Sequence, residues 1–269
     1  MDDFILNEQT YYSPEANKRY LSFHQYISIA GGLMIGGCEA KAMAELNGEW
    51  QDPTPEAFIV GGYVDAFFDN SLDKFKAEHP EVFTQKGELK APYKRAEKMI
   101  ERCTRDELFM KFMGGKKQVI MTAYMFGCDW KCKLDSYIPG VAIVDLKTTS
   151  GMHKAWRINN LGYVSFVEAF SYEKQLAIYQ KIVEINTGEH LPCYIAAVSK
   201  DDCPEIAIIE IDDFTLQNAL NEIEKNMPMV LAVKNGETPP IRCECCDYCK
   251  STKVLTDPIN FRDLITETE

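Results

Sequence analysis

The sequence is poor in basic residues and has no long apolar run. Its 269 residues include 29 lysines and arginines against 41 aspartates and glutamates, which gives a formal net charge of −12. Phosphate groups are bound mainly by lysine and arginine, so this balance argues against general affinity for nucleic acid. No stretch approaches the roughly 20 apolar residues that a membrane helix needs, so we expect no membrane partner.

The sequence also lacks an apolar leader, internal repeats and low-complexity linkers. Residues Met1 to Glu8 are acidic and contain no extended apolar core, so we expect no secretory signal. We therefore expect a cytoplasmic protein in a reducing compartment, where clustered cysteines are metal ligands or redox groups rather than disulfides. Because 46% of the residues are hydrophobic, we expect one domain over residues 1–269.

The chain divides into three parts by its local patterns. We predict a helical part over 20–113, a core over 114–235 and a cysteine-rich tail over 236–269. A proline at its start and two glycines at its end predict one amphipathic helix over 92–113. In the core, alternation and turn signals predict strands at 117–126, 130–138, 142–148, 191–199 and 206–211, and helices at 161–186 and 213–234. This order implies an α/β fold with a mixed sheet flanked by helices.

The run from Gly140 to Thr149 carries the clearest chemical signal. It is apolar until Asp145, and Lys147 follows two residues later. Side chains alternate along a strand, so these two point to one face and Leu146 to the other. A carboxylate that binds a divalent metal, beside an amine that steadies the attacking water, suits phosphodiester hydrolysis. Taken alone, the pair would more often be a surface salt bridge at a strand end.

A second acid, Asp135, lies on the preceding strand. A three-residue loop over 139–141 would pair Asp135 with Asp145, and a two-residue loop would place them on opposite faces. Cross-strand neighbours lie about 4.5 to 5.5 Å apart, which is close enough to share a metal. We predict the three-residue loop. Lys131 and Lys133 share the face of Asp135. They are either DNA-binding residues or ordinary solvated lysines.

Asp135 and the segment Asp145–Leu146–Lys147 resemble the PD-(D/E)XK nuclease superfamily. The details are most similar to phage-type exonucleases related to RecE and lambda exonuclease, which in turn resemble RecB-type nuclease domains. The resemblance implies a restriction-endonuclease-like core in which the two acids and the Leu146 carbonyl bind Mg²⁺ or Mn²⁺. It also implies that Lys147 orients the attacking water.

Two further motifs accompany these residues in the expected order. Gln175 and Tyr179 are spaced i, i+4 on a predicted helix, and relatives carry a Gln-x-x-x-Tyr motif beside the catalytic lysine. Asp65 stands where many relatives have a metal-binding histidine, and a carboxylate can also bind magnesium or manganese. Relatives often carry a glutamate on the strand before the first acid, whereas residues 117–122 offer none.

The sequence contains ten cysteines, four of them between residues 243 and 249. The segment from Ser22 to Cys38 resembles the opening of RecB-family nucleases of the AddAB type, which hold an iron–sulfur cluster between their chain ends. That resemblance implies four ligands, Cys38, Cys243, Cys246 and Cys249, and leaves Cys245 outside the set. Their short final spacing leaves zinc, or no metal, as alternatives. The other cysteines, Cys103, Cys128, Cys132, Cys193 and Cys203, are expected to be small buried hydrophobes.

The charge is unevenly distributed. Between Lys111 and Arg157 the sequence has eight basic residues against three acidic ones, a local charge of +5, so the remainder carries −17. A positive channel on an acidic exterior would draw a DNA end into the site and discourage loose binding elsewhere.

Together these patterns predict a Mg²⁺-dependent deoxyribonuclease that digests duplex ends. The resemblance implies 5′ to 3′ digestion in phage or prophage recombination, with a single-strand annealing protein as partner, and it leaves open a homo-oligomer. The alternative is a catalytically idle module that keeps the fold and binds nucleic acid or protein.

Overall fold

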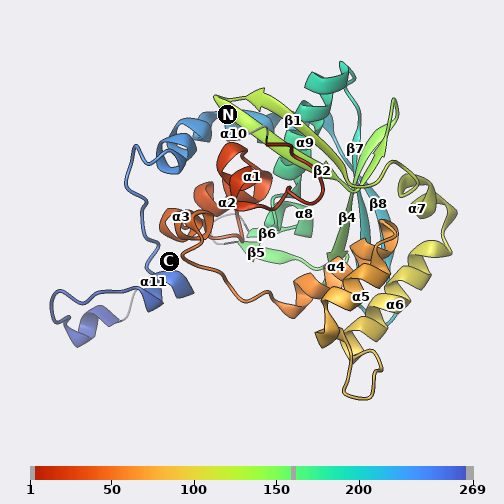
Figure 1. Cartoon of the computed structure of the whole chain (residues 1–269), viewed down its shortest axis with the longest axis horizontal. Helices are drawn as coiled ribbons and strands as arrows, with labels where there is room; N and C mark the ends of the chain where they lie inside the picture. Colours follow the sequence, from red (N-terminus) through yellow and green to blue (C-terminus); the bar gives the residue numbers. More distant parts are fainter. Residues whose placement is uncertain (1–3, 159–161, 265–269) are drawn as a thin grey trace.

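The computed structural model describes residues 4–158 and 162–264 (Figure 1). At its centre is a four-stranded mixed sheet in the order β3-β4-β7-β8, in which only β4 and β7 are parallel. The strands are β3 (Ser136–Ile138), β4 (Ala142–Thr149), β7 (Cys193–Ser199) and β8 (Ile206–Ile211). Helices cover both faces, so the predicted α/β fold is confirmed.

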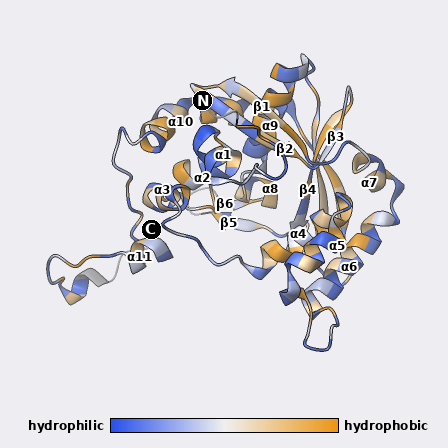
Figure 2. Cartoon of the chain, viewed as in Figure 1, coloured by the Kyte–Doolittle hydropathy of each residue, from blue (hydrophilic) through white to orange (hydrophobic). Residues whose placement is uncertain are grey.

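Strand β4 is buried on both sides, which explains its apolar sequence. Ile143 packs with the residues of α9 (Tyr172–Thr187) and α10 (Asp213–Lys234). Leu146 packs on the opposite side with α4 (Glu56–Phe68) and α6 (Ala91–Thr104). A strand covered on both faces needs a nearly continuous hydrophobic run, and Figure 2 shows hydrophobic residues in these central elements.

Two strands precede this sheet and form a separate antiparallel hairpin, β1 (Val119–Met125) and β2 (Cys128–Leu134). One face packs on α9 through side chains such as Trp130 and Leu134, both fully buried. The predicted single strand over 130–138 is therefore wrong. It breaks at Asp135, which lies between the two sheets, and its carboxylate accepts a hydrogen bond from the backbone N–H of Leu146 (2.9 Å).

The turn between β3 and β4 sets the register of the strand that carries Asp145. Ile138 pairs with Ala142, so the loop comprises residues 139–141. Gly140 adopts a φ of 69°, a conformation that glycine reaches without the steric cost of a side chain. The predicted three-residue loop is confirmed. Continuing this register by one residue places Asp135 beside Asp145.

Two predicted helices are divided in the structure. Residue 161, the predicted start of one of them, lies outside the described residues. The chain then forms β6 (Gly162–Val164), which pairs with β5 (Trp156–Ile158), followed by α8 (Phe166–Ala169) and α9. The helix predicted over 92–113 is α6 followed by α7 (Glu107–Phe112). The break occurs because the Asp106 side chain caps α7 by accepting the N–H of Phe109 (2.9 Å).

The N-terminal part is helical, as predicted, and its first helices, up to residue 47, lie beside the C-terminal tail (Figure 1). Its remaining elements, with those of the tail, are α1 (Pro14–Arg19), α2 (Phe23–Ala30), α3 (Glu39–Asn47), α5 (Leu72–Glu78), η1 (Pro80–Val82), α11 (Asp247–Ser251) and η2 (Phe261–Leu264). Of the helices in the described residues, none has the length and apolar character to cross a membrane.

Candidate functional site

The two acids of the predicted motif approach each other where the hairpin meets the central sheet. Asp145 lies on β4 and is 3% exposed. Asp135 is held beside β4 by its hydrogen bond from Leu146. The strand break at Asp135 and the three-residue loop together create this arrangement, because they turn both carboxylates toward the same region.

Lys147 lies on the same face of β4 as Asp145. Its Nζ is 2.6 Å from Asp145 Oδ2 and 4.6 Å from the centre of the Tyr172 ring. The ammonium group therefore has an ion pair on one side and an aromatic face on the other, an arrangement that favours its charged form. The predicted side-by-side placement of acid and amine is present in the structure.

Gln175 and Tyr179 approach this pair from α9. Gln175 Nε2 donates to Asp145 Oδ1 (3.0 Å) and to the hydroxyl oxygen of Tyr179 (3.0 Å). All three side chains are buried. Residues four apart share a helical face, so the predicted spacing leads to a real contact. Gln175 contacts the acid of β4 rather than Lys147.

The electrostatics of the site favour a bound cation. Burial, followed by the nearby charge of Asp145, raises the pKa of Asp135 to about 7. Burial opposes a charge on Lys147, but Asp145, Tyr172 and Asp135 outweigh it and raise the pKa of its ammonium group. Asp135 and Asp145 can carry two negative charges, and Lys147 supplies one positive charge to balance them. The two carboxylates therefore repel each other, and a bound cation would reduce this repulsion.

Asp65 approaches the acids from α4. Burial, and then the charge of Asp135, raises the pKa of the Asp65 carboxyl group well above its usual value. Among the described residues, the group of three or more side chains placed to hold one metal ion is formed by four cysteines, and the three acids do not form such a group.

These residues fit a divalent cation with oxygen ligands. Asp145 Oδ2 is buried and accepts no hydrogen bond of good geometry, although Lys147 lies beside it. Magnesium retains several waters and is usually bound by one or two carboxylates together with substrate oxygens. A site built on Asp135 and Asp145, with Asp65 as a further candidate ligand, matches that preference.

The two candidate DNA-binding lysines have different surroundings. Lys131 is 1% exposed, and its Nζ donates to the carbonyl of Tyr11 (2.5 Å) and to Asn17 Oδ1 (2.7 Å). Its ammonium group is thus already bound inside the protein, so we do not retain Lys131 as a phosphate ligand. Lys133 is half-buried and reaches the surface beside Tyr12.

Sequence reasoning assigned no role to two residues near the site. Tyr172 packs under Lys147, and it lies three residues before Gln175, so helical spacing could have identified it. His24 lies on α2. Desolvation and then the charge of Lys147 lower its pKa, which places its ring near these groups. His24 also lines a cavity of about 200 Å³ with Gln25 and Lys234, and no sequence pattern connected it to β4.

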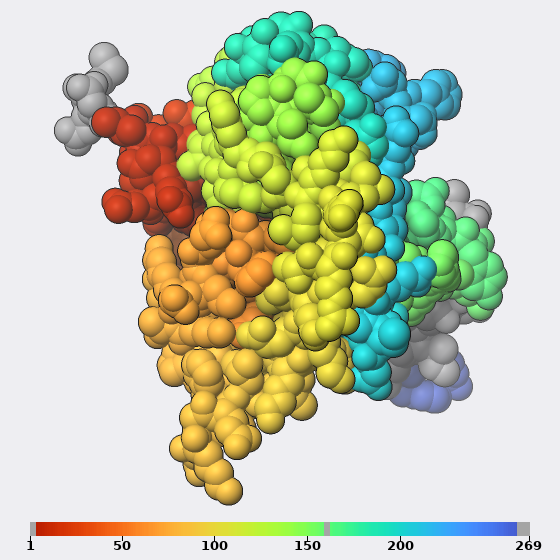
Figure 3. All heavy atoms as spheres, turned by 90° about the vertical axis from the view of Figure 1, so that its right-hand side faces the viewer, coloured from red at the N-terminus to blue at the C-terminus, as the bar shows by residue number. Residues whose placement is uncertain are grey.

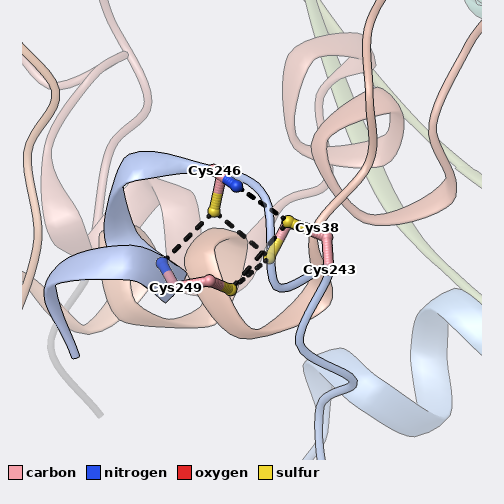
Figure 4. Close-up of side chains that lie close together, drawn as sticks. All are labelled: Cys38, Cys243, Cys246 and Cys249. Atoms are coloured by element: carbon pink, nitrogen blue, oxygen red, sulfur yellow. Dashed lines mark hydrogen bonds between the residues drawn. The ribbon is translucent and has the colours of Figure 1, made fainter. Parts of the chain in front are cut away.

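Four cysteines from the two ends of the chain form a second cluster (Figure 4). Cys38 Sγ lies 3.6 Å from Cys249 Sγ and 3.8 Å from Cys246 Sγ, and Cys243 Sγ is 3.9 Å from Cys249 Sγ. The structure thus brings together the four residues that the resemblance implied. Cys245 is exposed and approaches only Cys243, at 3.5 Å.

Backbone N–H groups surround the sulfur atoms of this cluster. Those of Lys41, Cys246 and Cys249 donate to Cys38, Cys243 and Cys246, respectively. Backbone N–H groups of Cys245 and Cys246 lower the pKa of Cys243 to about 6, whereas burial raises the pKa of Cys246 to about 12. Such a group of sulfur atoms can bind a soft metal ion.

The remaining cysteines only partly follow the expectation. Cys103, Cys132 and Cys193 are fully buried. Cys128 is half-buried. Cys203 lies in the loop between β7 and β8 and is exposed. The prediction of burial is wrong for these two.

Residues 22–252 match the family described as a PDDEXK-like domain of unknown function, DUF3799. A crystal structure from Eubacterium rectale, described as a "putative exonuclease", is 50% identical to this chain. The two superpose with a TM-score of 0.95 over 98% of this chain and 99% of the other.

A structure of SSO0001 covers 67% of this chain and 88% of its own, with 12% identity and a TM-score of 0.28, and this likeness carries no argument. No curated protein matches the sequence. The predicted relation to the PD-(D/E)XK nuclease superfamily is confirmed by the family match, which spans most of the chain. This chain belongs to the PDDEXK-like family DUF3799.

Proposed function

We propose that this protein is a metal-dependent DNA exonuclease that hydrolyses phosphodiester bonds from duplex ends. The observation that carries the proposal is the convergence of Asp135 and Asp145 beside Lys147. Membership in a PDDEXK-like family and the likeness to the E. rectale protein support nuclease function.

Asp135, Asp145 and the Leu146 carbonyl would hold Mg²⁺ or Mn²⁺, with Asp65 contributing. When bound, such an ion polarises the phosphate and lowers the pKa of a bound water. Lys147 provides a fixed positive charge for the developing negative charge of the transition state. Gln175 holds the carboxylate of Asp145 in place through its hydrogen bond, and Tyr179 in turn contacts Gln175.

The direction of digestion and the biological setting rest on the resemblance alone. It supports digestion from the 5′ end, which leaves a 3′ single strand for an annealing partner in phage or prophage recombination. The local charge of +5 between Lys111 and Arg157, within a chain of net charge −12, supports a DNA-binding face limited to one region.

Incubation of linear duplex DNA with Mg²⁺ tests this proposal. We expect wild type to degrade the linear duplex and leave closed circular DNA intact. Asp145→Ala should be inactive, whereas Asp129→Ala, which removes an exposed acid of β2, should retain activity. Degradation of circular DNA would contradict an exonuclease, and equal activity of the Asp145 variant would contradict the site.

The alternative function is a catalytically idle binding module. Asp65 in place of the relatives' histidine, and the missing glutamate at residues 117–122, favour this alternative. Binding of DNA by wild type, without hydrolysis under Mg²⁺ or Mn²⁺, would support it.

We further propose that the four cysteines bind one tetrahedral metal ion, with Zn²⁺ as the ion that fits best. Zinc–sulfur bonds of about 2.3 Å in a tetrahedron place sulfur atoms about 3.8 Å apart. Three of the sulfur–sulfur separations are 3.6, 3.8 and 3.9 Å, and all four sulfur atoms lie within 4.8 Å of one another, which supports this geometry. In a four-iron cluster each thiolate binds a different iron, which needs wider spacing. Anaerobic purification distinguishes them: colourless protein with one zinc supports the proposal, and a brown protein containing iron contradicts it.

A further inference from the structure

An N-terminal segment, Asn7–Ser13, packs against the β1–β2 hairpin beside the proposed site. The Asn7 side chain accepts the N–H groups of Gln9 and Thr10 (2.9 and 3.1 Å) and so fixes a turn. Tyr11 then enters the protein and is 6% exposed, whereas Tyr12 is 70% exposed. In Figure 3 this red segment lies against the yellow-green hairpin and above the orange helices.

Lys131 binds this N-terminal segment and so connects it to β2. Its Nζ binds the carbonyl of Tyr11 and the side chain of Asn17, and it lies 4.6 Å from the centre of the Tyr11 ring. A fully buried ammonium group needs such partners, because burying it alone is costly. Lys131 therefore serves to position the two tyrosines relative to the hairpin.

The ammonium group of Lys133 lies beside the ring of the exposed Tyr12. Its Nζ is 4.8 Å from the centre of the Tyr12 ring and 5.6 Å from that of Tyr11. The two rings meet edge to face, with centres 4.9 Å apart and planes at 84°. The ring of Tyr12 is thus held in position by its neighbours, and much of its surface is still open to solvent.

This arrangement lies close to the proposed site of hydrolysis. Lys133 is two residues before Asp135, a separation of about 7 Å along a strand. Its charge helps to lower the pKa of Asp135, after the larger effects of burial, Asp145, Lys147 and the Leu146 N–H group. A nucleotide that contacts Tyr12 and Lys133 would therefore neighbour the one bound at the carboxylates.

We infer that Tyr12 and Lys133 form a binding platform for an unpaired nucleotide of the DNA end, with the base stacked on Tyr12 and its phosphate beside Lys133. This inference rests on the proposed nuclease function. Bases inside a duplex present no free aromatic face, whereas an unpaired base does. Loss of one base–aromatic stack weakens binding by roughly 5- to 150-fold.

Fluorescence anisotropy with labelled DNA, in Ca²⁺ instead of Mg²⁺, tests the platform. The probes are a blunt duplex and the same duplex with a short unpaired end. We expect Tyr12→Ala to bind the unpaired end at least about 5-fold more weakly and the blunt duplex as wild type does. Tyr12→Phe keeps the ring and should bind both probes as wild type does.

Tyr124→Ala is the matched control, because Tyr124 is 69% exposed on the same hairpin but lies at its far end. The inference would be overturned if Tyr12→Ala bound the unpaired end as tightly as wild type does. It would also be overturned if Tyr124→Ala weakened this binding as much as Tyr12→Ala does. A parallel Mg²⁺ digestion by wild type separates the two proposals. Digestion by wild type without a binding defect in Tyr12→Ala rejects only the platform. Absence of digestion by wild type rejects the nuclease, and a binding defect in Tyr12→Ala would then still show a site for an unpaired nucleotide.

Discussion

At the scale of single residues, the ion pair between Lys147 and Asp145 favours the protonated state of the lysine. The lysine remains protonated because Asp145, Tyr172 and Asp135 raise its pKa against the effect of burial. A lysine in this state cannot act as a general base. It can only stabilise negative charge or orient water.

Replacement of Lys147 by Ala should reduce the turnover of linear duplex DNA by about 100- to 1,000-fold, the usual effect of removing one group that stabilises the transition state. DNA binding should change far less. Lys86→Ala, at an exposed loop position, is the control. A variant of Lys147 with full turnover would show that its charge has no part in the reaction.

Asp135 makes a second prediction, about pH. Its pKa is about 7 in the folded protein, against about 4 in an unfolded chain. Between these values the folded state holds a proton that the unfolded state has lost, so the free energy of unfolding must fall as pH rises. Without divalent ions, we expect the melting temperature to decrease from pH 5 to pH 8.

Asp135→Asn should make this decrease smaller, and Mg²⁺ should raise the melting temperature of wild type more at pH 8 than at pH 5. Thermal unfolding followed by circular dichroism measures both effects. The same slope in wild type and variant would contradict the assigned state of Asp135.

At the scale of secondary structure, the turn at residues 139–141 sets which residues face each other across β3 and β4. The Pro139–Gly140 pair predicted a turn here, and the three-residue loop was chosen because it alone brings Asp135 and Asp145 together. The break at Asp135 could not be predicted in the same way. It depends on a hydrogen bond from Leu146, which becomes available only when the hairpin and the central sheet are both formed.

Substitution of Gly140 tests the importance of the turn. Gly140→Val should lower the free energy of unfolding by about 1 to 3 kcal/mol, because a β-branched residue is strained at a φ of 69°. Gly140→Asn should cost less, since asparagine tolerates this conformation. The space around Gly140 is open, with Glu189 Oε1 3.7 Å from an added Cβ, so a clash would not explain the difference. Urea denaturation gives the values, and equal losses would contradict a backbone origin.

The helix over 161–186 shows why other elements were misjudged. Ser165 caps the short α8 together with Glu168, and Ser171 adopts a φ of 56° before α9 begins. Both serines were visible in the sequence. The apolar pattern of the stretch nevertheless favoured one continuous helix over the two breaks that these serines make.

At the scale of the whole molecule, the cysteine cluster joins segments 211 residues apart. The tail also contacts the N-terminal part through the N–H of Ala40, which donates to the carbonyl of Ile241 (3.1 Å). The cysteine spacing and the resemblance brought Cys38 into the predicted set. Nothing in the spacing gave the sulfur–sulfur distances that favour a single ion.

Cys249→Ser should abolish metal binding and lower the melting temperature by at least about 5 °C, because a bound metal stabilises only the folded state. Cys245→Ser should retain both properties, since Cys245 lies outside the set of four. Metal analysis and calorimetry measure these effects. Loss of the metal in Cys245→Ser but not in Cys249→Ser would contradict the assignment.

The most direct test of the account is calorimetric titration of the protein with Mn²⁺, in wild type and in Asp145→Asn. Asp135 and Asp145 carry more negative charge than Lys147 balances, so wild type should bind one Mn²⁺ ion. The variant should lose that binding while remaining folded. Unchanged Mn²⁺ binding after the substitution would contradict the claim that Asp135 and Asp145 share a metal.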